Sequence, residues 1–394
     1  MTRYNGIKYV PDRTVKRRSW ARVIVIGGGQ AGLAIGHFLK KAGVDFLILE
    51  SGHRIGDSWR KRWDSLRLFS SVLHDGLPGI PFPGDPRSFP TKDEVANYLE
   101  DYALKQELPI RFNTRVKSLH RQGDGFVVMT NGREYFEAEQ VVVATGPYQK
   151  LRVPSWAAEL DPAIVQIHAG QYKNPAQLPE GDVLVVGAGN TGAELAMEAA
   201  AGHKVWLSGR DVGQVPSFAR FGNQRLFWFL GRRVFTLKTP VGRMIHASVR
   251  SGHGQPLVRI RRKELLKAGI RRVGRTVGAS SNGKPRLADG RVLDVTSILW
   301  CTGFRLDFSW IHLPILADDG YPLHEFGRVK SQPGLYFLAL PFQRDMTSTL
   351  LGGVGRDAAL VAKWILERRA MSSRGRRIET DEAQSVRETR MTGT

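Results

Sequence analysis

One pattern occurs twice in this chain: an apolar strand, a glycine-rich turn, a helix rich in alanine and leucine, and a second strand. The first copy begins at Val23 and the second at Val183. Each turn has the spacing G-x-G-x-x-G directly after its strand, which is typical of a loop that binds a dinucleotide pyrophosphate at a helix N-terminus. A chain of 394 residues usually exceeds one hydrophobic core. We therefore expect an α/β protein with two three-layer, Rossmann-like dinucleotide-binding domains.

The first copy predicts an FAD site. Gly27 permits the tight turn, Gly29 lets the backbone approach a pyrophosphate, and Gly32 lets helix and strand pack closely. The second strand ends at Glu50, whose carboxylate can accept hydrogen bonds from both hydroxyls of an adenosine ribose. The alternative is an ordinary glycine-rich turn. The predicted FAD ligands of this unit are Gly27, Gly29, Gln30, Ala31, Gly32 and Glu50.

The second copy ends differently, on Ser208-Gly209-Arg210. No carboxylate stands there to repel a 2′-phosphate, and a guanidinium can bind one through two hydrogen bonds. This favours NADPH over NADH, and the alternative is that Arg210 is one more surface arginine. The predicted NADPH ligands of this unit are Gly187, Gly189, Asn190, Thr191, Gly192, Ser208 and Arg210.

Two further apolar strands, Val141–Ala144 and Ile298–Cys301, both stop at Thr-Gly. The carboxyl ends of strands in a parallel sheet face the ligand crevice, and a glycine there lets the backbone lie against a nucleotide. We assign Ala144, Thr145 and Gly146 to FAD, and Cys301, Thr302 and Gly303 to NADPH. Cys301 is the single cysteine, so an internal disulfide and a redox-active cysteine pair are excluded. We interpret it as a buried strand residue.

The order of the predicted elements indicates a discontinuous first domain. We expect a basic arm over residues 1–20, an FAD-binding domain over 21–155 and 305–369, an inserted NADPH-binding domain over 156–304, and a disordered tail over 370–394. Within these ranges the chain predicts a helix opening at Thr91, a strand around Ile110 to Val116, a hairpin turning at Asn131-Gly132, an irregular region from Val212 to Pro256, a buried strand over Gly334 to Leu340, and a closing helix over Gly352 to Arg368.

The charge balance is basic, with 58 Lys and Arg against 37 Asp and Glu. Such a field favours anionic ligands, but no aromatic interleaving accompanies the basic runs, so we expect no stable nucleic-acid partner. The longest apolar runs are far shorter than the roughly 20 residues of a membrane span. We expect a cytoplasmic enzyme without a membrane span or a metal site.

The chain resembles the class B flavin-containing monooxygenases, and more closely bacterial flavoproteins described as cation-diffusion-facilitator-associated oxidoreductases. The resemblance runs from about Arg22 to Ile365. It is carried by Gly56-Asp57-Ser58-Trp59-Arg60, Trp63-Asp64-Ser65-Leu66-Arg67-Leu68, Phe89-Pro90-Thr91-Lys92, Ala144-Thr145-Gly146-Pro147-Tyr148, Gly187 to Glu194, Leu340-Pro341-Phe342-Gln343 and Leu351 to Asp357.

The linker motif of those monooxygenases is only half present. His168 and Tyr172 match its second half, whereas Pro162 and Ile164 stand where the family has Phe and Gly. The alternative is that His168 and Tyr172 are packed linker residues.

The resemblance implies that NADPH delivers hydride to FAD, and that the reduced flavin reacts with dioxygen to give a C4a-hydroperoxide that oxygenates a small soft nucleophile such as an amine, a sulfide or a carbonyl compound. It implies His168, Tyr172 and Trp59 as candidate catalytic residues and adds Trp59, Arg60, Val116, Gln343 and Leu351 to the FAD ligands. The alternatives are an NADPH-dependent flavin reductase or oxidase that inserts no oxygen, and a redox-sensing regulatory flavoprotein linked to cation transport. Whether the protein forms a homodimer stays open.

Overall fold

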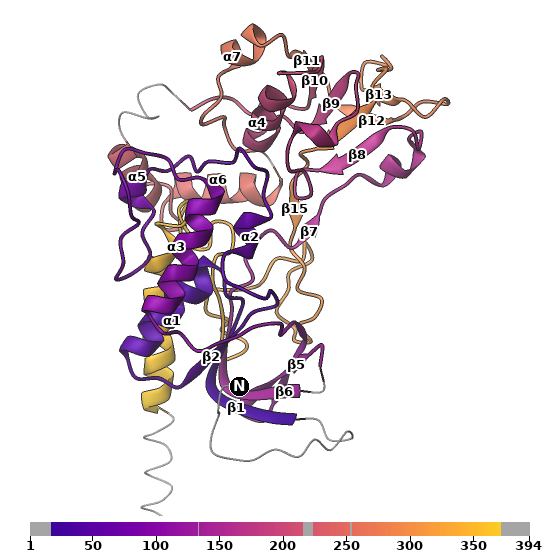
Figure 1. The fold of residues 1–394 in the computed structure, drawn as a ribbon. Coiled ribbons are helices and arrows are strands. Elements are labelled where there is room, and N and C mark those ends of the chain that lie inside the picture. The colour runs from indigo at the N-terminus through magenta and orange to yellow at the C-terminus, as the bar shows by residue number, and fades with distance from the viewer. Residues whose placement is uncertain (1–16, 133, 216–223, 253, 372–394) are drawn as a thin grey trace, which may run out of the picture.

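The computed structural model describes residues 17–132, 134–215, 224–252 and 254–371, which form two lobes in Figure 1. Each lobe is built on its own mainly parallel sheet, and each sheet carries one of the two glycine loops. Strands from the start and the end of the described chain pair in the lower lobe, and the strands of the upper sheet lie between them in the sequence.

The lower lobe contains a sheet of seven strands. Four of them run in the order β3-β2-β1-β6, and β5 and β4 continue the sheet as antiparallel strands. The returning strand β16 pairs in parallel with β6, which ties the end of the chain to its beginning. The bounds are β1 Arg17–Ile26, β2 Phe46–Leu49, β3 Ile110–Arg111, β4 Val116–Gln122, β5 Gly125–Thr130, β6 Glu134–Val143 and β16 Leu335–Phe337.

Helices cover one face of this sheet. They are α1 (Gln30–Lys41), α2 (Asp57–Arg60), α3 (Lys92–Lys105) and a closing helix over residues 354–371, which lies beside α1 in Figure 1. Leu33, Leu99 and Val361 share one buried cluster on this face. The opposite face is covered by the loops around Phe308 and Ile315. The lobe therefore has three layers.

The upper lobe contains five parallel strands in the order β11-β10-β9-β14-β8. Helices α4 and α7 pack on one face, and a second cluster with Trp300 lies on the other. The bounds are β8 Val165–His168, β9 Val183–Val186, α4 Asn190–Ala199, β10 Val205–Ser208, α7 Arg262–Lys267, β11 Arg271–Val273, β12 Thr276–Ala279, β13 Pro285–Leu287 and β14 Ser297–Trp300. The two chain crossings between lobes pair with each other as β7 (Lys150–Leu151) and β15 (Phe304–Arg305).

Several local predictions are confirmed. The Thr91 hydroxyl accepts from the Glu94 backbone N–H at 3.2 Å while the Glu94 carboxylate accepts from the Thr91 N–H at 2.7 Å, so α3 begins with a full capping box. Strands β5 and β6 form the predicted antiparallel hairpin around Asn131-Gly132. The buried strand β16 and the closing helix lie within a few residues of their predicted ranges.

Four predictions need correction. Strand β1 begins at Arg17, inside the predicted arm, because β6 extends far enough to pair with it. The predicted strand around Ile110 is only two residues long, and β4 starts a separate strand at Val116. The region expected to be irregular contains α5 (Gln224–Arg233) and α6 (Pro240–Arg250). The closing helix includes residues 370 and 371, and the rest of the predicted tail lies outside the described residues.

Candidate functional site

The two glycine loops have the same geometry, position by position. Gly27 and Gly187 have positive φ angles of 109° and 113°, and a Cβ on either would lie 2.6 Å or 2.2 Å from the carbonyl oxygen of Ala144 or Cys301. A Cβ on Gly32 would lie 1.9 Å from the Gly27 carbonyl oxygen, and one on Gly192 would lie 1.7 Å from the Gly187 carbonyl oxygen. Glycine is required at these four positions by close packing within the protein itself.

Gly29 and Gly189 are different, because a Cβ on either would meet no atom within 4 Å. Each is the N-cap of its helix, α1 or α4, and neither helix has a side-chain cap or an acidic residue in its first turn. The first N–H groups of both helices therefore face open space with the positive end of the helix dipole behind them. A phosphate group supplies the missing acceptor, so both loops fit a dinucleotide.

Glu50 lies beside the first glycine loop. Its Oε2 accepts from the Gly28 N–H at 2.7 Å and its Oε1 accepts from the Gly52 N–H at 2.6 Å. These two bonds fix the carboxylate beside the loop. Oε1 also accepts from the Ser51 hydroxyl at 3.4 Å, whereas Oε2 keeps a lone pair for a ribose hydroxyl.

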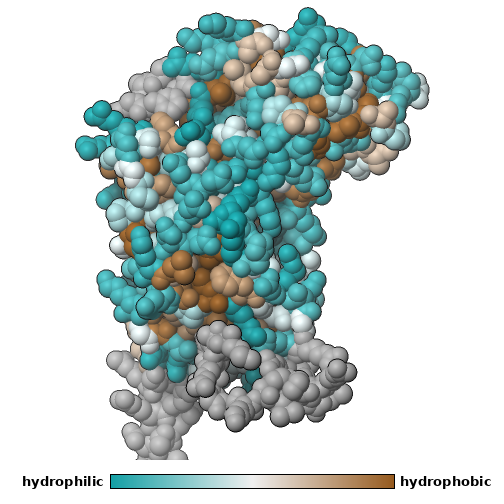
Figure 2. Space-filling view, viewed as in Figure 1, coloured by the Kyte–Doolittle hydropathy of each residue, from teal (hydrophilic) through white to brown (hydrophobic). Residues whose placement is uncertain are grey.

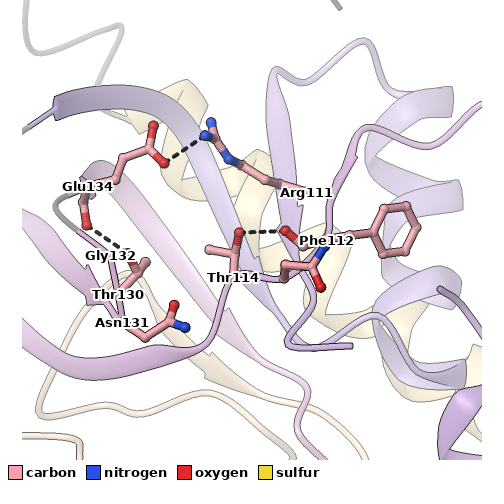
Figure 3. A pocket seen from close by; sticks show the side chains of 8 residues that line it. Arg111, Phe112, Thr114, Thr130, Asn131, Gly132 and Glu134 are labelled. Carbon is pink, nitrogen blue, oxygen red and sulfur yellow. Dashed lines mark hydrogen bonds and ion pairs between the residues drawn. The ribbon is translucent and has the colours of Figure 1, made fainter. Parts of the chain in front are cut away.

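A pocket of about 310 Å³ lies beyond the Glu50 loop, between the end of β3 and the β5–β6 hairpin (Figure 3). An ion pair of 2.7 Å between Arg111 and Glu134 crosses one side of it. The backbone N–H of Thr114 donates to the Glu50 carbonyl at 2.9 Å, so this wall is tied to the predicted ribose site. Val116, predicted to bind FAD, is half-buried at the start of the adjoining strand β4. Its role stays a prediction.

In the second lobe, Gly209 occupies the position of Glu50. The equivalence follows from the backbone, because Gly27 N–H donates to the Leu49 carbonyl and Gly187 N–H donates to the Ser208 carbonyl, both at 2.8 Å. A glycine with φ of 143° leaves this position without any side chain. The place of the ribose-binding carboxylate is thus open to a phosphate.

Two arginines lie close to the open position at Gly209. Arg210 is exposed one residue further on, and Arg272 of β11 donates to the Gly209 carbonyl at 3.3 Å. Sequence reasoning missed Arg272, because only strand pairing brings it to Gly209. Ser208, in contrast, is fully buried, and its hydroxyl bonds to the Gly274 carbonyl and the Thr276 hydroxyl, both at 2.8 Å. Ser208 is therefore enclosed in the lobe, whereas Arg210 and Arg272 lie beside the open position at Gly209.

The remaining predicted ligands of the second loop are packed into the lobe. The Asn190 side chain holds the segment after the α5–α6 region, accepting from the Val258 N–H at 2.8 Å and donating to the Pro256 carbonyl at 3.2 Å. Thr191 is half-buried in the first turn of α4. Cys301 lies directly after β14 and not within it, and burial raises the pKa of its thiol to about 12, which is the behaviour of an unreactive cysteine.

His168 is held as a neutral imidazole at the end of β8. The Gly170 N–H donates to Nδ1 at 3.0 Å, so Nε2 carries the proton and donates to the Gly303 carbonyl at 3.0 Å. Burial is the main cause that lowers the pKa of His168. The imidazole thereby fixes the start of the second crossing between lobes, next to Thr302, whose hydroxyl donates to the Arg152 carbonyl.

Tyr172, the other linker residue, is fully buried against α4. Its hydroxyl has no hydrogen-bond partner among the described residues. Burial, and then the nearby charge of Glu198, raises the pKa of Tyr172. Neither linker residue is placed by an observation against reacting groups, so their catalytic roles stay predictions.

The other predicted FAD residues lie around the first loop. The Gln30 side chain donates to the Thr349 carbonyl at 2.8 Å and so joins α1 to the segment before the closing helix. Thr145 accepts from the Gln149 amide at 2.8 Å, and Gly146 has a φ of 69°. Leu351 is buried, and Ala31 lies in the same core. Gln343 is fully buried, with its amide bonded to the Phe326 carbonyl at 3.1 Å and to the Leu340 N–H at 3.3 Å.

Trp59 is half-buried on the short helix α2 and packs against the helical core of the lower lobe. Arg60, the next residue, connects α2 to its surroundings. Its guanidinium forms an ion pair with Glu100 of α3 at 2.5 Å and donates to the Ile55 carbonyl at 2.6 Å. These bonds hold α2 in place, so Arg60 positions Trp59.

Sequence reasoning missed the segment that joins the lobes, residues 61–67. Trp63 is buried in the core of the upper lobe although it belongs to the lower one, and the Asp64 N–H donates to the Lys173 carbonyl at 2.8 Å. Arg62 lies 4.6 Å from the Tyr148 ring and 5.4 Å from the Phe304 ring, and burial lowers its pKa. We call residues 61–67 with these contacts the clamp, and no spacing pattern in the sequence predicts it.

Comparisons with known proteins agree with this geometry. Residues 24–217 match the family model described as pyridine nucleotide-disulphide oxidoreductase. An uncharacterised CzcO-like oxidoreductase from Geobacillus kaustophilus is 43% identical over 350 residues, which cover 87% of this chain and 98% of the relative. This chain has a single cysteine, so it lacks the cysteine pair of a dithiol relay.

Solved structures give the same fold. A flavin-containing monooxygenase from Stenotrophomonas maltophilia is 25% identical with a TM-score of 0.71, covering 89% of this chain and 99% of that chain. The structure of OTEMO in complex with FAD and NADP has a TM-score of 0.64 at 16% identity, covering 90% of this chain and 86% of that one. The predicted fold class is confirmed.

Among the described residues, no helix is long and apolar enough to cross a membrane. Hydrophilic residues cover most of the face in Figure 2, with separate hydrophobic patches between them.

Proposed function

Because the chain belongs to the family of CzcO-like oxidoreductases and is a flavin-dependent enzyme related to the flavin monooxygenases, we propose that it uses NADPH and FAD to insert oxygen into a small soft nucleophile. The observation that carries this proposal is the pair of equivalent loops, each with an open glycine at an uncapped helix N-terminus. Two dinucleotides fit one chain, one on each lobe.

The residues of the chain divide the work. Gly29 and the first turn of α1 would hold the FAD pyrophosphate, and Glu50 would hold its adenosine ribose. Gly189 and α4 would hold the NADPH pyrophosphate. When bound, the flavin supplies the two-electron chemistry that joins NADPH oxidation to dioxygen. The chain must then keep the lobes aligned and exclude water from the flavin. The hydrogen bond from His168 to the Gly303 carbonyl and the packing of Trp63 in the upper lobe would keep the lobes aligned.

The experiment that tests oxygen insertion uses the purified holoenzyme with NADPH, isotopically labelled dioxygen, and a panel of an amine, a sulfide and a ketone. We expect the label in a product, with NADPH consumption rising when the substrate is present. If all of the consumed dioxygen is released as hydrogen peroxide with every substrate, the protein is a flavin reductase or oxidase and not a monooxygenase. Negligible NADPH turnover would favour a regulatory flavoprotein.

Coenzyme choice is tested at Arg210. The open position at Gly209 and the cations beside it support NADPH, because a 2′-phosphate gains charge-assisted hydrogen bonds there. Arg210→Ala should weaken NADPH binding by about 2 kcal/mol and leave NADH binding nearly unchanged. Lys204→Ala is the matched control, because Lys204 lies before the other end of β10, in an ion pair with Asp182 at 2.8 Å. Equal losses with both coenzymes in Arg210→Ala would mean that Arg210 is structural.

A further inference from the structure

Two segments far apart in the chain meet above the residues that precede the closing helix. The first is the loop containing His74, and the second is α5. The His74 carbonyl would lie 1.5 Å from a Cβ on Gly352, and the Trp228 ring would lie 3.3 Å from it. On the same helix, a Cβ on Gly231 would lie 2.9 Å from the Thr347 side chain. The three segments are therefore in tight contact.

Three side-chain nitrogens are enclosed at this junction without a hydrogen-bond partner among the described residues: Nε2 of His74, Nε1 of Trp228 and Nε of Arg232. Trp228 is only 2% exposed, its ring centroid lies 5.3 Å from that of His74, and the Arg232 guanidinium lies 4.6 Å from the Trp228 ring. Each unsatisfied buried polar group costs roughly 1–3 kcal/mol, so such a cluster is rarely left without a ligand.

The chemistry of these nitrogens indicates which kind of hydrogen-bond partner they lack. Indole and guanidinium nitrogens only donate, so the absent partner of Trp228 and Arg232 is an acceptor. Arg232 is already oriented, because its Nη2 donates to the Gly352 carbonyl at 2.8 Å. The neighbouring Asp75 keeps one carboxyl oxygen without a partner among the described residues, and burial raises its pKa to about 7, so this carboxyl can donate only in its protonated form.

The part of the sequence that contains α5 and α6 is basic. Between Val212 and Lys263 the sequence contains eleven lysines and arginines and no aspartate or glutamate. The buried acids of the underlying segment lie beside arginines: Asp357 is 3.0 Å from Arg344 and Asp345 is 3.4 Å from Arg356, although neither carboxyl oxygen of Asp357 has a hydrogen-bond partner among the described residues. A region that encloses donors and carries this excess of cations favours an anionic acceptor.

We propose that His74, Trp228 and Arg232 bind a carboxylate group of the substrate, so that this enzyme acts on small carboxylate-bearing molecules. The proposal rests on the function proposed above and names its substrate class. An arginine with one fixed arm and a free Nε–H, beside an indole N–H, provides two donors to one carboxylate.

Binding of benzoate to the oxidised holoenzyme tests the proposal, with benzamide as the neutral analogue. Binding is followed by the flavin difference spectrum and by tryptophan fluorescence. We expect benzoate to bind at least roughly tenfold more tightly than benzamide, and both Trp228→Phe, which removes only the N–H, and Arg232→Gln to weaken benzoate binding by roughly tenfold. Arg233→Gln is the control, because it removes the same charge from an exposed site one residue along α5.

Equal affinity for benzoate and benzamide, or unchanged benzoate affinity in both variants, would overturn the proposal. So would loss of bound flavin in Trp228→Phe with unchanged benzoate affinity of the remaining holoenzyme, because the nitrogens would then serve the cofactor. The measurement needs neither NADPH nor turnover. An enzyme that binds benzoate as expected but releases only hydrogen peroxide would keep the carboxylate site and lose the proposed oxygen insertion.

Discussion

Gly29 illustrates how much a single residue can decide. It has a φ of −74°, which any residue adopts, and no atom of the protein lies within 4 Å of an added Cβ. Gly29→Val should therefore fold normally but place its side chain where the FAD pyrophosphate must lie. We expect the protein to be purified without flavin, measured by the visible absorbance per protein, with an unchanged circular dichroism spectrum.

The second loop supplies the matched control. Gly189→Val makes the same change at the same position of the other lobe, again with no atom of the protein within 4 Å. It should retain FAD and lose reduction by NADPH. A fully flavin-loaded Gly29→Val protein would remove the assignment of the first loop.

Asp75 is a buried residue with a pH-dependent effect on stability. It is fully buried, its Oδ1 accepts from the Ser70 hydroxyl at 2.6 Å, and burial raises its pKa to about 7. In the unfolded chain the carboxyl ionises near pH 4. The folded protein therefore holds this proton more tightly, and the stability that it contributes is lost as the pH rises from about 4 to 7.

Asp75→Asn keeps the acceptor for Ser70 and removes the ionisation. The melting temperature of the variant should exceed that of the wild type by more at pH 8 than at pH 5, with a difference in the free energy of unfolding of roughly 1–3 kcal/mol between the two conditions. Asp85→Asn, an exposed acid in the same loop, should show no such difference. A gain independent of pH would show that Asp75 does not titrate in this range.

At the scale of elements, the sequence predicts what local rules decide. The capping box of α3 and the two glycine loops depend on residues within a few positions of each other, and all were predictable. Helices α5 and α6 were not, because their buried sides pack on residues far along the chain: the ring of His246 lies 5.8 Å from that of Phe342. Ser208 is a similar case, since strand neighbours near Gly274 decide where its hydroxyl points.

The crossing between lobes gives a prediction about β8. His168→Ala removes one donor from the Gly303 carbonyl and one acceptor from the Gly170 N–H, which loosens the start of the second crossing. We expect NADPH to reduce the flavin within a few-fold of the wild-type rate, and a larger share of the consumed dioxygen to leave as hydrogen peroxide. Stopped-flow absorbance and a peroxide assay measure the two quantities.

His203→Ala is the control for His168. Its ring also contacts one backbone carbonyl, that of Gly181 at 3.1 Å, but it lies outside both crossings. An equal rise of peroxide in both variants would indicate a general loss of packing and not a role of the linker.

At the scale of the whole molecule, the described residues connect the two lobes in two places apart from the crossings: at the α5–α6 region, which packs on the lower lobe, and at residues 61–67. Residues 61–67 leave the lower lobe and pack into the upper one, where Trp63 is 6% exposed in the core beside Tyr172. The Asn174 amide donates to the Asp64 carboxylate at 2.8 Å, and Arg259 donates to the Arg67 carbonyl at 3.0 Å. Each loop needs only its own lobe, whereas hydride transfer needs both lobes aligned, so this clamp should matter for electron transfer more than for binding.

Trp63→Ala tests whether the clamp affects electron transfer more than cofactor binding. Truncating a buried tryptophan costs roughly 3–5 kcal/mol, and here the loss falls on the contact between lobes. We expect calorimetry to show separate unfolding of the two lobes, and NADPH to reduce the flavin at least tenfold more slowly, while flavin content and reduction by dithionite stay unchanged. Trp20→Ala, at a 53% exposed tryptophan of β1, should behave as wild type. A single transition with an unaltered rate of reduction by NADPH in Trp63→Ala would show that the lobes stay aligned without the contacts of Trp63.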